Sequence, residues 1–527
     1  MTDRQQRLAA LQQAPAWDLL VIGGGITGAG VAREAARRGL RVALVEARDF
    51  AWGTSSRSSK MVHGGLRYLG SGQLGLTRES LRERETLLAE APGLIDRLPY
   101  LFAHQPGKFP GRRVFGALLS VYDWLSGHRA HGFLDRTQIA QWLPDLDSEP
   151  LSGASWFSDA LVDDSRLVMR VLQEAQTDGA VAVNYLRATE LLRAGDQVTG
   201  AKLQCALSGQ SLELKAKLTI TATGAWTDQL RQALGHKPRI RPLRGSHVVI
   251  PFWRLPLSCA VLLKHPADGR PVFIYPWEGV SVVGTTDLDH TSDLSAEPVI
   301  SQAEADYLLQ AANCRFPALG LGHDDVISTW SGVRPVVSSG GSKSPSAESR
   351  EHAIWQQPGL ISIAGGKLTT FREIACDALA RADEITLAQN PSGAKVFRHN
   401  APAQHRPRGI TLRQWQRLKG QYASALGQVL AAGPLERIGH CECLLAEAIW
   451  SCGHEQVQHL DDLMLRRLRI GMLLPEGGRD WLQQQRPLLQ TALDWDDSRW
   501  HSEYQRYIDI WQKAYAPCPW QTQHSAS

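Results

Sequence analysis

The stretch Trp17-Asp-Leu-Leu-Val-Ile-Gly-Gly-Gly-Ile-Thr-Gly28 decides the fold class of this chain. Its apolar run, residues 19–22, predicts a buried strand, and a Gly-x-Gly-x-x-Gly turn follows directly. Residues 29–38 have the pattern of a helix with small side chains on one side, and residues 41–46 form a second apolar run that ends in an acid. Strand, glycine turn, helix, strand and acid, in this order, predict a Rossmann-like dinucleotide-binding unit.

The glycines and the acid of this unit each have a physical role. Gly23 permits a tight turn, and Gly25 lets backbone N–H groups approach a pyrophosphate at the positive end of the helix. Gly28 lets the helix pack close to the sheet. Glu46 lies 18 residues after Gly28, near the spacing at which a carboxylate accepts hydrogen bonds from a ribose.

The next segment is the polar loop Gly53-Thr-Ser-Ser-Arg-Ser-Ser-Lys-Met-Val-His-Gly-Gly-Leu-Arg-Tyr68. Its hydroxyls and cations could wrap a ligand that bears phosphate. A solvated surface loop is the alternative. The density of hydroxyl groups directly after the acid favours a binding loop.

Composition excludes several classes of protein. The 527 residues carry 57 basic and 53 acidic side chains, a formal charge of +4, which does not suggest a general nucleic-acid binder. The eight cysteines have no regular spacing and argue against a secreted disulfide scaffold. The start lacks the apolar core of a signal peptide, and no run of about 18 apolar residues is present. We expect a soluble or peripherally attached protein.

Two later segments repeat the pattern of a buried strand followed by a glycine turn. Residues 218–226, Leu-Thr-Ile-Thr-Ala-Thr-Gly-Ala-Trp, predict a buried strand that runs into a glycine turn. Residues 360–372 predict a strand, a Gly-Gly-Lys turn and then a helix that reaches about residue 388. Between the first two strands and these lies a predicted helix at 166–177.

Residues 239–330 have a different character. Four short apolar runs predict strands: 245–250, 271–276, 281–287 and 325–330. An amphipathic helix is predicted at 301–314. We expect a mostly antiparallel, substrate-binding sheet inserted into a dinucleotide domain whose own segments are about 17–100, 150–235 and 331–390.

Residues 109–129 combine apolar and aromatic side chains with flanking cations. A helix here would place Phe115, Leu119 and Tyr122 on one face, together with Leu118 and Leu125. Such a helix either packs on its own core or lies on a membrane surface. Residues 74–98 also have helical spacing.

The C-terminal part, from residue 408 to 527, is predicted to be helical, with helices at 411–432, 440–452, 455–473, 479–488 and 499–515. His440-Cys-Glu-Cys443 and Cys452-Gly-His454 invite a zinc interpretation. On a helix, however, residues two apart lie about 200° apart, so Cys441 and Cys443 could not share a metal. We expect core cysteines and no metal.

Taken together, these motifs resemble the FAD-dependent (aerobic, respiratory) glycerol-3-phosphate dehydrogenase family. The motifs that carry the resemblance are the first glycine turn, TSSRSSKMVHGGLRY, the segment 162–167, TATGAW, RGSHVVI, VGTTD, SGVRP and GGKLTT. They span residues 17 to about 372, and the helical tail is similar to that family's C-terminal domain. The loop at 342–348 and the divergent tail depart from simpler members.

The resemblance implies an α/β fold, α+β overall. A Rossmann-like FAD-binding domain with an inserted antiparallel-sheet substrate domain would occupy residues 1–400, and an all-helical domain would follow at 408–527. It also implies oxidation of sn-glycerol 3-phosphate to dihydroxyacetone phosphate. Electrons would pass to a quinone, with peripheral attachment to the cytoplasmic face of the cell membrane. A homodimer stays open, and no nucleic-acid partner is expected.

In the reaction that the resemblance implies, the flavin takes a hydride from an alcohol carbon while a base takes the hydroxyl proton. His247 and His63 are the candidate bases. Arg334, a catalytic candidate, Arg67 and Lys367 would bind the substrate phosphate, because arginine offers a bidentate fork. Tyr68, Thr286 and Asp287 would complete the substrate site. The expected FAD-binding residues are Gly23, Gly25, Ile26, Thr27, Gly28, Glu46, Thr54, Ser55, Ser59, Lys60, His63, Gly64, Gly65, Leu66, Thr223, Gly224, Gly365, Gly366, Lys367, Leu368 and Thr369.

Three alternatives remain. A glycerol-3-phosphate oxidase would keep the same site and pass electrons to oxygen. A flavin amino-acid or amine oxidase would also pair an arginine with a tyrosine, but against a carboxylate. A non-catalytic FAD-bearing protein would have no reason to keep several separated cations and histidines around the flavin motifs.

Overall fold

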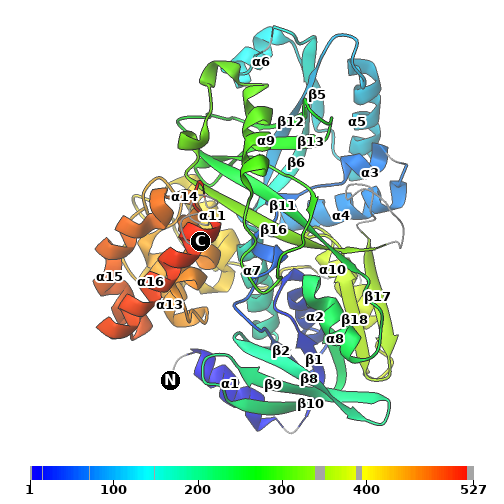
Figure 1. The fold of residues 1–527 in the computed structure, drawn as a ribbon, viewed down its shortest axis with the longest axis vertical. Helices are drawn as coiled ribbons and strands as arrows, with labels where there is room; N and C mark the ends of the chain where they lie inside the picture. Colours follow the sequence, from blue (N-terminus) through cyan, green and yellow to red (C-terminus); the bar gives the residue numbers. More distant parts are fainter. Residues whose placement is uncertain are drawn as a thin grey trace.

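The computed structural model contains two β-sheets, the helices that cover them and a separate group of C-terminal helices (Figure 1). It describes residues 3–14, 16–70, 72–147, 149–338, 351–386 and 395–518. The sequence-predicted loop at 342–348 lies outside these ranges.

The first sheet contains the strand that leads into the glycine turn. Its strand order is β17-β18-β10-β1-β2-β7, and β1 lies between two parallel neighbours, β10 and β2. The bounds are β1 Trp17–Ile22, β2 Val42–Val45, β7 Val181–Val183, β10 Ser211–Thr221, β17 His352–Gln357 and β18 Leu360–Gly365. The predicted strands at 19–22 and 41–46 are confirmed, and they pair with each other as a dinucleotide unit requires.

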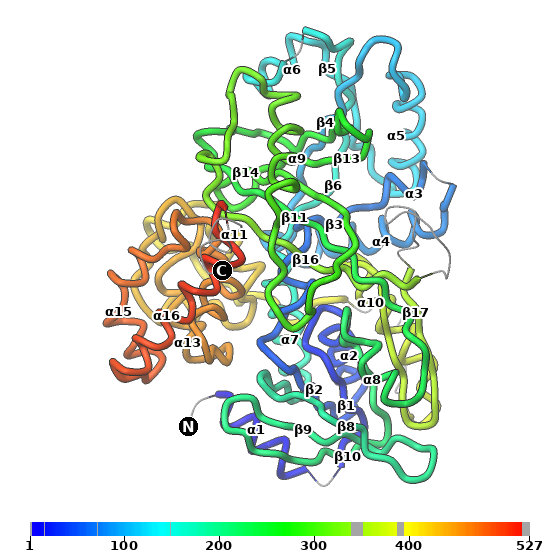
Figure 2. The backbone as a smooth tube through the Cα atoms, in the orientation of Figure 1, coloured from blue at the N-terminus to red at the C-terminus, as the bar shows by residue number. Residues whose placement is uncertain are grey.

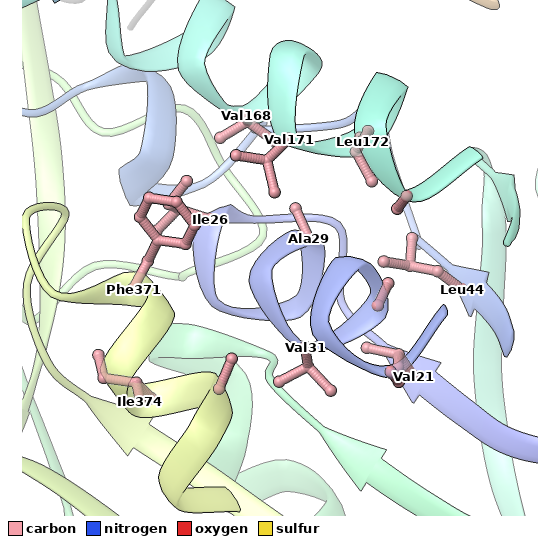
Figure 3. Close-up of a cluster of buried hydrophobic side chains, with 14 of the residues drawn as sticks. Val21, Ile26, Ala29, Val31, Leu44, Val168, Val171, Leu172, Phe371 and Ile374 are labelled. Atoms are coloured by element: carbon pink, nitrogen blue, oxygen red, sulfur yellow. The ribbon is translucent and has the colours of Figure 1, made fainter. Parts of the chain in front are cut away.

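Helix α2 (Ile26–Ala36) follows the glycine turn and lies between α7 (Asp164–Thr177) and α10 (Phe371–Leu379) on one face of this sheet (Figure 3). Small residues allow the close approach: a Cβ at Gly30 would lie 2.9 Å from Cδ2 of Phe371. The helix predicted at 166–177 is confirmed. The helix after the Gly-Gly-Lys turn ends at Leu379, earlier than the predicted 388.

The first half of β10, which precedes the part paired with β1, belongs to an antiparallel extension of the sheet. Strands β8 (Leu186–Ala194) and β9 (Gln197–Cys205) form a hairpin, and β9 pairs with the first half of β10. Helix α1 (Asp3–Gln13) packs beside β7 and β10 at the lower edge of Figures 1 and 2.

The second sheet has the order β15-β11-β14-β13-β12-β4-β6-β3, with β16 added to β11 and β5 added to β6. Its pairs are antiparallel except for β12 with β4. The bounds are β3 Met61–Val62, β4 Ile95–His104, β5 His131–Leu134, β6 Gly153–Val162, β11 Ile240–Pro251, β12 Ala260–Lys264, β13 Pro271–Trp277, β14 Val280–Gly284, β15 Leu288–Asp289 and β16 Ser328–Val337.

The second sheet is larger than the insertion predicted at 239–330. Strands β3, β4 and β6 come from segments that we assigned to the dinucleotide domain, 17–100 and 150–235. The helix predicted at 74–98 ends at Glu90. Pro92 and Gly93 follow, and Gly93 has a positive φ of 87°, so the chain turns there and continues as β4. The turn packs closely on the C-terminal helices, because a Cβ at Gly93 would lie 2.0 Å from the Gln416 carbonyl oxygen.

Helices cover both faces of the second sheet. α4 (Leu74–Glu90) and α5 (Arg112–Ser126) lie on one side, and α9 (Gln302–Asn313) contributes to the cluster on the other. The helix predicted within 109–129 is therefore confirmed as α5. The helix predicted at 301–314 is confirmed as α9. Shorter helices are α3 Leu66–Gly70, α6 Arg136–Trp142 and α8 Thr227–Ala233.

The C-terminal helices pack against the second sheet and the loop after β2 (Figure 2). They are α11 Leu412–Tyr422, α12 Leu426–Ala431, α13 Leu445–His454, α14 Ile470–Leu473, α15 Arg479–Leu493 and α16 Asp497–Ala514. The predicted helix at 455–473 is wrong: a π-helical turn at Asp462–Arg467 ends where Arg469 adopts a positive φ of 66°. No helix among the described residues is long and apolar enough to cross a membrane.

The predicted helix at 440–452 begins only at Leu445, so our geometric reason against zinc was wrong. Cys441 and Cys443 precede the helix. The Cys443 thiol lies 3.3 Å from the Leu468 carbonyl oxygen and 3.2 Å from the Arg417 guanidinium, inside a packed core. Among the described residues no group of metal-ligand side chains comes together.

Candidate active site

A cavity of about 310 Å³ opens at the carboxyl ends of the parallel strands. It is bounded by the glycine turn after β1, the loop after β2 and the turns after β10 and β18. The predicted cofactor residues on its wall are Gly23, Gly25, Ile26, Thr27, Glu46, Thr54, Ser55, Thr223, Gly224, Gly365, Gly366, Lys367 and Leu368. Four segments far apart in the sequence therefore meet at one site.

The glycine turn has the geometry that a pyrophosphate needs. Gly23 has a φ of 118°, and a Cβ at Gly28 would lie 1.9 Å from the Gly23 carbonyl oxygen, so α2 packs directly on the turn. Gly25 is different, since a Cβ there would meet only the Ser55 side chain, with its Oγ at 3.1 Å. The Ile26 N–H donates to Ser55 Oγ at 3.0 Å. The N-terminus of α2 thus faces the cavity.

Glu46 lies beside the glycine turn. Its carboxylate accepts hydrogen bonds from the N–H groups of Gly24 at 2.6 Å and Arg48 at 2.9 Å. Burial raises the pKa of Glu46, and these two N–H groups oppose the rise. The side chain is fixed at the cavity wall, where a ribose hydroxyl can reach it.

Eight predicted cofactor residues do not line this cavity: Gly28, Ser59, Lys60, His63, Gly64, Gly65, Leu66 and Thr369. Lys60 is fully buried instead, with Nζ 2.9 Å from Asp164 Oδ1 and above the ring of Trp330. Burial and Arg469 lower the pKa of Lys60 to about 7, against the opposing effect of Asp164. Lys60 therefore anchors the binding loop from behind.

Sequence reasoning missed other residues of the wall: Ile22, Ala47, Arg48, Trp52, Gly53, Ser58, Arg187, Ala188, Ala222, Trp226, Gln229, Leu230, Ser295, Pro335, Ile363 and Ala364. Arg48 was within reach of prediction, because it follows Glu46 by two positions. Arg187 and Ser295 come from β8 and from the β15–α9 connection, which no local motif links to the glycine turn.

His247, on β11, lies beside the binding loop. Its Nε2 and Ser59 Oγ share a hydrogen bond of 2.9 Å, and its ring stacks on Trp330 with centroids 4.7 Å apart. Burial lowers the pKa of His247 well below 6.5, and the charges of Lys60 and Arg334 lower it further. The imidazole is buried and neutral, and half-buried Ser59 lies beside it.

Arg334, on β16, is held by the neighbouring turn. Its guanidinium donates to Asp287 Oδ1 at 2.9 Å and to Thr285 Oγ1 at 3.0 Å. The next residue, Pro335, lines the cavity. Thr286 was predicted to bind substrate, but it is buried and its hydroxyl donates to Glu304 at 2.7 Å. It supports the sheet.

The remaining predicted substrate residues lie in a second group. Lys367 Nζ lies 3.8 Å from the centroid of the Tyr68 ring and 3.5 Å from Ser80 Oγ. The His63 and Tyr68 rings are 6.4 Å apart, and Arg67 is exposed. Lys367 and Pro335 both line the cavity, whereas Arg334, Arg67 and Tyr68 are not part of its wall.

Comparison with known proteins decides the family. A family model described as FAD dependent oxidoreductase matches residues 18–372, and one described as the C-terminal domain of alpha-glycerophosphate oxidase matches residues 380–500. The chain is 36% identical to glycerol-3-phosphate dehydrogenase 2 of Mycobacterium tuberculosis, over 95% of this chain and 90% of the relative. It is 38% identical to the aerobic glycerol-3-phosphate dehydrogenase of Staphylococcus aureus, over 68% of this chain and 66% of that one.

The chain belongs to the FAD-dependent glycerol-3-phosphate dehydrogenase family. Among solved structures, the glycerol-3-phosphate dehydrogenase of Bacillus halodurans complexed with FAD is similar, with a TM-score of 0.75, 26% identity and 98% of each chain covered. The predicted family and fold class are thereby confirmed.

The cofactor of this dehydrogenase-family chain is FAD. The residues present fit it: the open face of Gly25, the N-terminus of α2 and the fixed carboxylate of Glu46 suit a pyrophosphate and a ribose in sequence. The turns at Thr223 and Gly365 complete the wall beyond. A dinucleotide bound at Glu46 and running past Gly25 would direct its flavin end toward the Arg334 and Lys367 groups.

Proposed function

We propose that this protein oxidises sn-glycerol 3-phosphate to dihydroxyacetone phosphate with FAD. The observation that carries the proposal is the arrangement at one end of the dinucleotide cavity. Lys367 and Pro335 line the wall there. Arg334 precedes Pro335 in β16, and its charge acts on the neutral, buried His247, which is bonded to Ser59. Relatives named glycerol-3-phosphate dehydrogenase support the substrate.

The phosphate of the substrate would be held by Arg334 and Lys367. Arg334 is oriented by Asp287 and Thr285, and a guanidinium can present two parallel N–H groups to a phosphate. Lys367 adds a second charge from the turn after β18. Two cations from different sheets would bind a doubly charged phosphate better than they would bind a singly charged carboxylate.

The proton of the C2 hydroxyl would reach His247 through Ser59. Neither residue lines the cavity, but His247 is only 1% exposed, whereas Ser59 is half-buried and shares a hydrogen bond with Nε2. The substrate hydroxyl would donate to Ser59 Oγ while the serine proton moves to Nε2. The depressed pKa keeps the imidazole neutral at neutral pH, and Nε2 accepts the proton in the tautomer that carries its hydrogen on Nδ1.

FAD, when bound, supplies the acceptor for the hydride that leaves C2. The alcohol therefore loses one hydride and one proton, and the carbon becomes a ketone. The residues of this chain orient C2, hold the phosphate and accept the proton.

Anaerobic mixing tests the proposal. Glycerol 3-phosphate is expected to bleach the oxidised flavin of the purified protein, whereas glycine, proline and other amino acids leave it oxidised. Bleaching by amino acids alone would replace the proposal with an amino-acid oxidase.

We further propose that the electrons pass to a quinone and that the protein attaches peripherally to the cytoplasmic face of the cell membrane. Helix α5 supports this with an outward stripe of apolar residues, Val114, Val121 and Trp124, beside the exposed cations Arg112 and Arg113. Trp124 is 79% exposed. The homodimer remains a prediction, to be checked by light scattering.

The second candidate is an oxidase that uses oxygen, because the model matched at residues 380–500 is named for alpha-glycerophosphate oxidase. Reoxidation of the bleached protein separates the two. Rapid reoxidation by a soluble quinone with slow peroxide release favours the dehydrogenase. Stoichiometric peroxide on exposure to air favours the oxidase.

A further inference from the structure

A second cavity, of about 550 Å³, lies between the loop after β2, the β8–β9 hairpin and the C-terminal helices. Four arginines line it, two from the dinucleotide half and two from α16: Arg48, Arg187, Arg499 and Arg506. The wall also contains Ala47, Trp52, Tyr185, Ala206, Leu207, Gln458, His459 and Asp461. None of the glycines of the turn belongs to it.

Among the described residues of this wall, the one carboxylate, Asp461, is already engaged. Asp461 accepts a hydrogen bond from Arg466 at 2.7 Å and pairs with Arg506. Burial alone would raise the pKa of Asp461, but the charges of Arg466 and Arg506 lower it strongly. Asp461 therefore neutralises Arg506, and Arg499 pairs with Glu503, so Arg48 and Arg187 are the arginines of this wall that pair with no carboxylate among the described residues.

Arg48 and Arg187 form no ion pair with a carboxylate within the described ranges of the chain. Arg48 stacks on the Trp52 ring at 3.8 Å and donates to the Ser295 carbonyl, so its orientation is fixed. Burial lowers the pKa of Arg48, and the charge of Arg187 lowers it further against the effect of Glu297. These two cations repel each other across a cavity wall.

Arg499 approaches the same space from the helical domain. It donates to the Gln458 carbonyl at 3.1 Å and pairs with Glu503 at 2.9 Å, and Glu503 also accepts from His459. These two contacts fix the position of the Arg499 guanidinium. Half-buried Arg48 and exposed Arg187 on one wall, with Arg499 opposite them, would be stabilised by an anion between them.

We infer that this cavity binds a compact anion that carries two or more negative charges on phosphate groups. Guanidinium forks pair with phosphate oxygens in a bidentate way, and three of them arranged around 550 Å³ suit a diphosphate better than a monovalent ion. Arg48, Trp52 and Arg187 also border the FAD cavity, so the anion would lie beyond the ribose end of the cofactor. It would bridge the dinucleotide half and the C-terminal helices.

Calorimetric titration of the FAD-loaded protein with pyrophosphate tests this inference, with sodium chloride used to hold ionic strength constant. We expect saturable binding of one pyrophosphate per chain. Arg187→Gln and Arg499→Gln should each weaken it about tenfold or more, since each removes a charge-assisted contact. The control Arg486→Gln removes an equal charge from α15, outside the cavity, and should leave the affinity unchanged.

Three outcomes would overturn the inference. One is the absence of saturable binding, and another is equal weakening in Arg486→Gln, which would indicate ionic screening only. The third is binding to FAD-free protein alone, displaced by added FAD, which would make the cavity part of the dinucleotide site. Arg499→Gln should keep the wild-type rate of flavin reduction, so a loss of binding there is separable from a loss of the proposed activity.

Discussion

Arg334 is the residue of the second sheet that we propose to bind the substrate phosphate. Replacing it with alanine should lower kcat/KM for glycerol 3-phosphate roughly 10- to 150-fold, because a hydrogen bond to a charged group is worth about 1.5–3 kcal/mol. Oxidation of glycerol, which has no phosphate, should change far less. Steady-state rates with both substrates provide the measurement.

Arg241→Ala is the matched control, since Arg241 also pairs with an aspartate, Asp289, on the same sheet, but it is not among the charges that act on His247. It should leave both rates close to wild type. If Arg334→Ala impaired glycerol and glycerol 3-phosphate equally, Arg334 would act on the reacting centre or on folding and not on the phosphate.

Ser59 and His247 should act as one unit. The pKa of His247 is depressed, so its nitrogen stays unprotonated as the pH falls through 6.5, and flavin reduction should show no acidic limb there. The limb should appear only at lower pH, when the imidazole is finally protonated. Ser59→Ala should slow reduction about 10²-fold or more across the range. Stopped-flow reduction from pH 5 to 8 measures both.

The conservative variant Ser59→Thr keeps the hydroxyl and should restore much of the rate. A limb centred near 6.5 in the wild type would contradict a depressed pKa. A His247→Asn variant with wild-type rates would require His63 to be considered as the base.

At the scale of single residues, the motifs predicted which residue types form the site, but not which way each side chain points. The motif VGTTD offers two consecutive threonines, and successive side chains of an extended chain point to opposite sides. Thr285 faces Arg334, whereas Thr286 faces Glu304 and stabilises the sheet. Ser59 likewise belongs to the predicted binding loop, but its partner His247 is 188 positions away, which no local pattern indicates.

At the scale of elements, the C-terminal helices hold the loop that binds FAD. Asp49 is fully buried and accepts hydrogen bonds from Arg466 at 2.5 Å and Arg467 at 2.8 Å. Arg469 donates to the Ser56 carbonyl at 2.6 Å and lies 3.2 Å from Asp164. The helical domain therefore supports the cofactor site without lining its cavity.

Arg469→Met should consequently loosen FAD. Losing a charged contact of about 1.5–3 kcal/mol should raise the Kd for FAD roughly tenfold or more, as measured by flavin fluorescence on removal and readdition of the cofactor. Arg417→Met is the control: Arg417 is equally buried and pairs with Glu447, away from the loop. Both variants should lower the Tm, but equal loss of FAD affinity in both would reduce the effect to general destabilisation.

Elements were predictable where one local signal dominates. The glycine turn, β1, α2 and β2 follow from periodicity and glycine placement, and the structure confirms them. The second sheet was underestimated because β4 has mixed exposure, with Asp96 and Arg97 outward, and was absorbed into the preceding helical pattern. Its partner β12 is more than 150 positions away, so only tertiary packing decides the pairing.

On the scale of the whole molecule, α5 is the surface that we propose to meet the membrane. Trp124→Ser should reduce pelleting with anionic liposomes at low salt, because an exposed indole favours the interface between water and lipid. The variant should fold normally, since its side chain is 79% exposed. Trp253→Ser is the control: Trp253 is also exposed but contacts His440 beside the C-terminal helices.

Equal pelleting of wild type and Trp124→Ser would return α5 to a purely structural role. A stronger effect of Trp253→Ser would move the membrane contact to the region of Trp253 and His440. Either result leaves the proposed chemistry untouched, because neither tryptophan lines the FAD cavity.

The central claim is that hydride leaves C2 of glycerol 3-phosphate for FAD while a side chain of this protein takes the hydroxyl proton. Single-turnover reduction of the flavin under anaerobic conditions, with substrate carrying hydrogen or deuterium at C2, tests it most directly. We predict complete bleaching at saturating substrate, and slower bleaching with the deuterated compound. Flavin that stays oxidised, or that is reduced at the same rate by both isotopologues when the chemical step limits the rate, would contradict the account.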